Sequence, residues 1–134
     1  MTRDYNIDGV RTNSLEAFYD EISEILIPGA EWGRNLDAFD DILRGGFGTP
    51  EDGFRIRWSN SADAKKYLGY KETVRQLEIR LQKCHPTARE KVRAELAAAK
   101  ECRGPTVFDW LVEIIRHHGP SGDEPEDNVS LALE

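Results

Sequence analysis

The chain has 134 residues, the size of one domain with a single hydrophobic core. Its 39% hydrophobic and 32% charged residues are typical of a globular protein and exclude a disordered one. No apolar run approaches the roughly 18 residues that a membrane span requires, and residues 1–5 lack the apolar segment of a signal peptide. We therefore expect one domain over residues 1–134, cytoplasmic and without membrane contact.

The net charge of −7 is distributed unevenly along the chain. Residues 14–52 carry −8, residues 53–104 carry +7 and residues 105–134 carry −6. A segment rich in acidic residues repels nucleic acid and attracts cationic surfaces. The basic segment could contact nucleic acid. However, its thirteen basic residues are interspersed with six acidic residues along amphipathic helices, which favours a solvated face. We expect a basic protein partner and no direct nucleic-acid binding.

Residues 5–8 predict a short first strand, and Ser14 is a good N-cap for the helix that follows. Apolar residues recur along this helix at helical spacing, with acids on the other face, until Pro28 and Gly29 end it. The apolar positions are Leu15, Phe18, Ile22, Ile25 and Leu26.

A short acidic helix comes next, with Asn35 as its expected N-cap and Gly45 as its stop. Its apolar stripe must face a core, and three acids, Asp37, Asp40 and Asp41, point the other way. Asp37 and Asp41 are four residues apart, so their like charges should cost about 0.2–0.5 kcal/mol. This acidic face is either merely solvated or a binding surface. The stripe is Leu36, Phe39, Ile42 and Leu43.

Residues 54–58 alternate large apolar residues with two arginines, which predicts a half-buried strand, most simply at a sheet edge. A short helix over residues 62–68 follows. Two amphipathic helices joined at His85 and Pro86 then predict a helical hairpin, with Thr87 as the cap of its second helix.

The most apolar helix is expected over residues 107–118, followed by a flexible polar linker over 119–127 and a strand over 129–133. Strands separated by helices favour a parallel sheet. The predicted fold is α/β: a small three-stranded parallel sheet with helices packed on it and a helical insertion at about 59–104, between strands two and three.

Signals for catalysis or a cofactor are weak. Asp37 and Asp41 could form a catalytic carboxylate pair, but both lie on one exposed helix face without a cleft. His117 and His118 are explained as cations at a helix C-terminus, and no second half of a metal site accompanies His85. The two cysteines are expected to be buried free thiols. We expect no enzymatic activity, no cofactor and no metal.

The segment Trp32-Gly33-Arg34-Asn35-Leu36-Asp37-Ala38-Phe39, together with Asp41, resembles the barstar family of intracellular ribonuclease inhibitors. The match rests on an aromatic-Gly-x-Asn-Leu-Asp-Ala-hydrophobic run with a second aspartate four residues after the first. Residues 54–58, 107–119 and 128–133 resemble the second strand, last helix and last strand of that family. Its three-stranded parallel sheet agrees with the fold predicted above.

The resemblance implies that the loop and the short helix block the active site of a cationic, guanyl-specific ribonuclease. Carboxylates there replace RNA phosphates against the basic residues of the enzyme. The residues implied in partner binding come from the loop, the helix and the last helix. They are Trp32, Gly33, Asn35, Asp37, Asp40, Asp41 and Glu113.

At two positions of the loop and the short helix, Glu31 and Asp40, the chain departs from the type member of the family, which has aromatic residues there. Both replace aromatic anchors with charge, so the partner surface differs. We expect an antitoxin-like bacterial inhibitor of a barnase-like ribonuclease, monomeric when free. The alternative is a non-catalytic regulatory or scaffold protein that keeps the fold and binds a different basic protein.

Overall fold

A computed structural model describes residues 3–134. Its three strands are β1 (Arg3–Asp8), β2 (Phe54–Ser59) and β3 (Val129–Leu133). Its α-helices are α1 (Leu15–Glu21), α2 (Leu36–Arg44), α3 (Ser61–Tyr67), α4 (Tyr70–Lys83), α5 (Arg89–Lys100) and α6 (Val107–His117). Short helical turns are η1 (Gly9–Arg11), η2 (Ile22–Leu26), η3 (Pro86–Ala88) and η4 (Pro125–Asp127). Among the described residues, every helix is too short or too polar to cross a bilayer.

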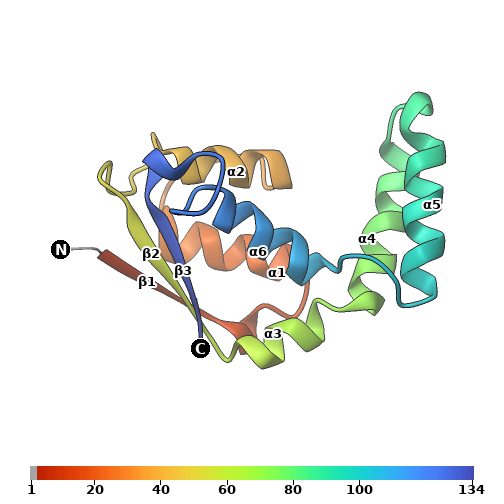
Figure 1. The fold of residues 1–134 in the computed structure, drawn as a ribbon, viewed down its shortest axis with the longest axis horizontal. Coiled ribbons are helices and arrows are strands. Elements are labelled where there is room, and N and C mark those ends of the chain that lie inside the picture. The colour runs from red at the N-terminus through yellow and green to blue at the C-terminus, as the bar shows by residue number, and fades with distance from the viewer. Residues whose placement is uncertain (1–2) are drawn as a thin grey trace.

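The three strands form one parallel sheet in the order β1-β2-β3, which confirms the predicted α/β fold. Helices α1, α2 and α6 lie together on one side of this sheet (Figure 1). Residues Phe54, Ile56 and Trp58 of β2 point into that layer and are at most 1% exposed. The helical segment between β2 and β3 is present as predicted.

The prediction that residues 54–58 form an edge strand is wrong, because β2 pairs with a neighbour on both sides. Its alternation reflects the open face of the sheet. There Arg55 forms two 2.9 Å hydrogen bonds with Asp4, and Arg57 binds Glu134 at 2.7 Å. A sheet covered on one face only gives the same pattern in a central strand as in an edge strand.

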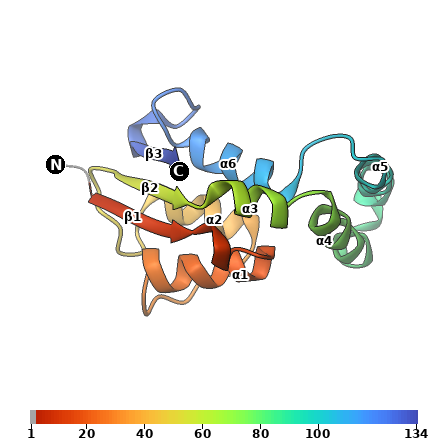
Figure 2. The same cartoon turned by 90° about the horizontal axis from the view of Figure 1, so that it is seen from below.

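Two hydrophobic clusters are present. The main one lies between the sheet and the helices α1, α2 and α6. A smaller one lies inside the α4–α5 hairpin, and Trp110 of α6 packs against both. The hairpin therefore carries its own small core and stands at one end of the molecule (Figure 2). Its buried members are Leu77, Val92, Leu96 and Ala99.

Two local predictions in the hairpin are wrong. Thr87 does not cap α5, because the hydroxyl of Thr87 contacts the His85 ring at 2.8 Å and Ala88 occupies the N-cap position. The cysteines are free, as predicted, but they are not buried: Cys84 is half-buried and Cys102 is exposed.

Residues 119–127 form a folded turn in place of the predicted flexible linker. The N–H of Glu124 donates to the carbonyl of His117 at 2.9 Å, and that of Asn128 donates to Pro125 at 3.1 Å. Gly122 lies so close to the end of α6 that an added Cβ would sit 2.2 Å from the His117 oxygen. The composition of the segment predicts flexibility, but its backbone forms hydrogen bonds with the end of α6.

Candidate partner-binding site

The acidic helix α2 is capped and stopped as predicted. The side chain of Asn35 accepts a 2.8 Å hydrogen bond from the N–H of Ala38, which satisfies a free donor of the first turn. The helix ends at Gly45, whose φ of 109° is accessible only to glycine without strain. Phe39, Ile42 and Leu43 are at most 2% exposed, so the apolar face anchors α2 on the core.

The loop before α2 is held against η2 and α1. The indole N–H of Trp32 donates to Ser23 Oγ at 2.7 Å, and its ring packs edge-to-face on Tyr19 with centroids 5.4 Å apart. Arg34, at a φ of 51°, forms an ion pair with Asp20. Gly33 is exposed and lies close to Asn35 and to Ala38. Trp32 is thus half-buried and positions the loop.

The three aspartates of α2 lie in different environments. Asp37 is exposed and, among residues 3–134, forms no ion pair. Asp41 is also exposed and contacts Arg44 at 2.8 Å, which relieves the like-charge repulsion expected from Asp37. Asp40 is turned toward α6 and is only 27% exposed.

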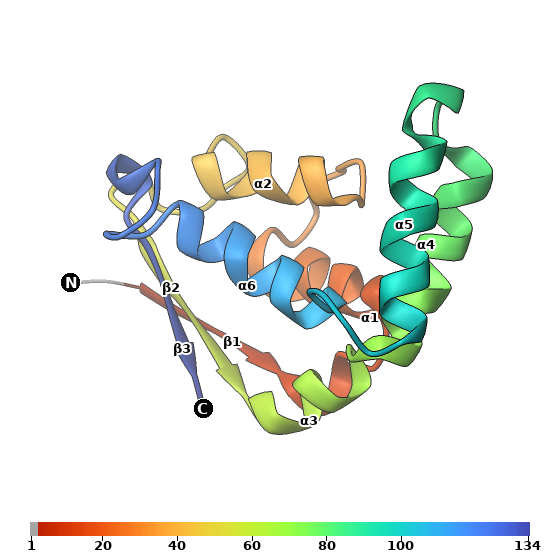
Figure 3. The same ribbon diagram turned by 45° about the vertical axis from the view of Figure 1, so that its right-hand side comes forward.

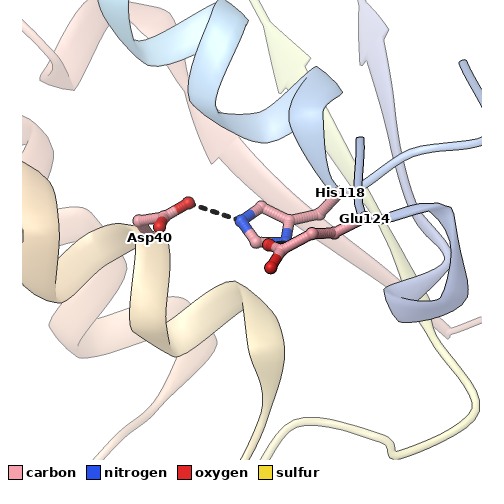
Figure 4. A group of neighbouring side chains, drawn as sticks. All are labelled: Asp40, His118 and Glu124. Atoms are coloured by element: carbon pink, nitrogen blue, oxygen red, sulfur yellow. Dashed lines mark hydrogen bonds and ion pairs between the residues drawn. The ribbon is translucent and has the colours of Figure 1, made fainter. Parts of the chain in front are cut away.

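Asp40 contacts His118, a fully buried histidine just after the end of α6 (Figure 4). Asp40 Oδ1 lies 2.6 Å from Nε2 of His118, and Asp127 Oδ2 lies 2.6 Å from Nδ1. The two ring nitrogens of His118 thus face carboxylate oxygens from two different elements. His118 therefore ties α2 to the turn that contains Asp127.

This pair of contacts is part of a larger charged network. Arg44 contacts Asp40 at 3.1 Å and Glu124 at 3.1 Å, and Glu124 also lies 3.2 Å from His118 Nδ1. Hydrogen bonding to Glu124 and nearby negative charge raise the pKa of Arg44 above its ordinary value. Asp40, His118 and Glu124 are close enough together to hold a metal ion, but the Arg44 guanidinium already supplies the compensating positive charge.

The interpretation of His118 as an ordinary cation at a helix end is incomplete, because His118 also joins this network. The partners of His118 lie 78 residues before it and nine residues after it. The available signal was the run of acids that follows the helix, at Asp123, Glu124 and Asp127.

Glu113 of α6 lies beside the acidic helix. A shallow hollow of about 370 Å³ runs between α2 and α6. Asp37 and Asp40 line it from α2, and Glu113 and His117 line it from α6. Three acids from two helices therefore border one surface, on which a cationic group would be attracted from both sides.

Comparison with protein families gives one match. The family model described as Barstar (barnase inhibitor) matches residues 2–103, about three quarters of the chain. This range contains β1, the loop, α2, β2 and most of the inserted helical segment. A search of curated proteins finds no match.

Proposed function

Because the chain belongs to the barstar family, we propose that it inhibits a cationic, barnase-like ribonuclease by covering its active site with α2 and the preceding loop. The site consists of Asp37 and Asp41 at its centre and Glu113 at its border. Trp32, Gly33 and Asn35 hold the loop at the rim. Asp40 holds α2 in position through its contact with His118.

The single observation that carries the proposal is the exposure of Asp37 and Asp41 on a helix whose opposite face is buried. Their carboxylates are one turn apart on a rigid support, so binding requires little ordering of side chains or backbone. Asp37 has no ion pair within residues 3–134, so a basic group of the partner can neutralise it without breaking an existing contact.

The test is calorimetric titration of a panel of guanyl-specific ribonucleases, including barnase, with the wild-type chain and with Asp37→Ala and Asp41→Ala. Each substitution is expected to weaken binding at least about tenfold, the loss from one charge-assisted contact of about 1.4 kcal/mol. The matched control is Asp63→Ala, which removes an exposed acid from the first turn of α3. Equal affinity in all four proteins would refute the proposed site.

A second candidate function is binding of a different basic protein by the same fold. It is favoured by Asp40, which occupies the position of an aromatic anchor in the family type member. Asp40 contacts His118 and Arg44 within the chain. Without that anchor, α2 offers charge and little apolar area. Absence of inhibition across the whole ribonuclease panel would favour this alternative over the first proposal.

A further inference from the structure

The α4–α5 hairpin is fixed to the body at its base. Glu72 accepts a 2.8 Å hydrogen bond from the N–H of Leu15 at the start of α1. The hydroxyl of Thr73 accepts a 2.9 Å hydrogen bond from the N–H of Val107 at the start of α6. Arg75 adds an ion pair to Glu16 of α1. These contacts set the direction of the hairpin relative to the rest of the protein.

The hairpin forms one wall of a cleft beside the proposed site. Figure 3 shows the first turn of α2 directed toward the hairpin. Between them lies a hollow of about 690 Å³, bordered by α1, the loop before α2, and α4. On the α4 side it is lined by Gln76, Ile79, Arg80 and Lys83.

The cleft adjoins the hollow between α2 and α6, because Leu36 and Asp37 line both. A partner that covers Asp37 therefore lies at the mouth of the cleft. Since specific protein interfaces bury about 800 Å² on each partner, contact with Asp37 alone would leave most of such an interface to be found on neighbouring surfaces. The α4 wall is one of the two surfaces that adjoin Asp37.

The two walls carry opposite charge. Asp37 carries the free negative charge on the α2 side among the described residues, because Arg34 in the adjoining loop is paired with Asp20. Arg80 and Lys83 line the α4 side. Arg80 is held with its guanidinium 5.0 Å from the centre of the Trp110 ring, and Lys83 is exposed. Within the described chain neither of these bases forms an ion pair. The free charge of the α4 wall is therefore positive, which suits an acidic surface.

We propose that the α4–α5 hairpin is a second arm of the partner-binding surface. Ile79, Arg80 and Lys83 contact an acidic flank of the same ribonuclease whose basic active site takes Asp37 and Asp41. The inference rests on the proposed function and adds a specificity determinant to it. A ribonuclease with a basic cleft but no acidic flank is bound more weakly, because it loses this second contact.

The test measures the affinity of barnase, or of the ribonuclease in the panel that binds, for the full chain with Lys83→Glu. The matched control is Lys91→Glu, the same change at an exposed position of α5 outside the cleft. Both substitutions make the chain equally more acidic, which by itself strengthens attraction to a cationic enzyme. Lys83→Glu is expected to weaken binding about tenfold, whereas Lys91→Glu leaves it unchanged or tighter. Lys83→Arg, which keeps the charge, is expected to retain wild-type affinity.

The outcomes separate the inference from the function on which it rests. Equal affinity of Lys83→Glu and Lys91→Glu, with loss of binding in Asp37→Ala, overturns the second arm and leaves the inhibitor proposal standing. Unchanged binding in both Asp37→Ala and Asp41→Ala overturns the inhibitor proposal and the second arm together. Thermal unfolding of each variant, expected to match the wild type because both lysines are exposed, excludes a folding defect as the cause.

Discussion

Asp40 Oδ1 and His118 Nε2 lie 2.6 Å apart and join the middle of the acidic helix to the end of α6. The aspartate next to it in sequence, Asp41, is 61% exposed, and among the described residues its one ion pair is to Arg44. Two adjacent carboxylates thus have different tasks. One maintains the position of α2, and the other is available to a partner.

This difference predicts losses of stability of different size for two neighbouring substitutions. Asp40→Ala leaves a buried histidine without one of its acceptors and should lower the free energy of unfolding by about 2 kcal/mol. Asp41→Ala removes an exposed ion pair and should lower it by less than about 1 kcal/mol, while weakening ribonuclease binding. Urea denaturation and calorimetry of both variants make the comparison. A stability loss in Asp41→Ala as large as that in Asp40→Ala would contradict it.

Glu72 makes stability dependent on pH. Burial alone would raise its pKa, but hydrogen bonds from Arg75, the Leu15 N–H and Gln76 outweigh burial and lower the pKa below the ordinary 4.5. A carboxyl group with a lowered folded-state pKa stabilises the protein above its unfolded-state pKa. That stabilisation is lost as the pH falls through the folded-state value.

Glu72→Gln should therefore lower the free energy of unfolding at pH 7 by about 2 kcal/mol, because it removes a buried charge that holds Arg75. The difference from the wild type should shrink as the pH falls below about 4. Denaturation curves at several pH values measure both effects. Glu78→Gln, an exposed position of the same helix, is the control and should give a small difference at every pH.

Gly53 is expected to be intolerant of a side chain. Its φ is 105°, and an added Cβ would lie 2.4 Å from the carbonyl oxygen of Asn128, just before β3. Gly29 also has a positive φ, of 84°, but faces open space. Gly29→Ala should cost about 1 kcal/mol from backbone strain alone, and Gly53→Ala considerably more. Thermal unfolding of the two variants tests this order.

Ribonuclease association should depend on salt. Asp37 and Asp41 are exposed charges, and the proposed partner has a basic cleft, so raising the ionic strength from about 0.01 to about 0.15 M should slow association. In the Asp37→Ala, Asp41→Ala double variant this dependence should be weaker. Stopped-flow fluorescence measures both rates, and identical salt slopes in the two proteins would contradict steering by these residues.

Most helices and strands could be predicted from local sequence patterns. Helix α2 could be predicted from its Asn35 cap, its apolar stripe and Gly45, since all three act within a few residues. The central position of β2 could not, because alternation reports that one face is exposed and carries no information on the number of neighbouring strands. The sheet order depends on long-range pairing.

In the candidate site, too, local features could be predicted from the sequence and long-range contacts could not. The spacing of Asp37 and Asp41 is a local property of one helix, so their common exposed surface could be predicted. The contact between Asp40 and His118 could not be predicted, because the two residues lie 78 positions apart in the sequence. The role of α4 was equally hidden, since only the fold brings Lys83 to the same cleft as Asp37.

The hairpin leaves and rejoins the body at almost the same point, where the carbonyl of Leu68 accepts a 3.1 Å hydrogen bond from the N–H of Phe108. A deletion of residues 70–104 could therefore be closed by a short loop. The shortened chain would lose Glu72 and Thr73, the acceptors for the N–H groups of Leu15 and Val107. Ser14 and Thr106 would still cap the two helices, so such a minimised protein needs new acceptors only for these two N–H groups. The hairpin is an insertion by position, but it also supplies hydrogen-bond acceptors to two helices of the body.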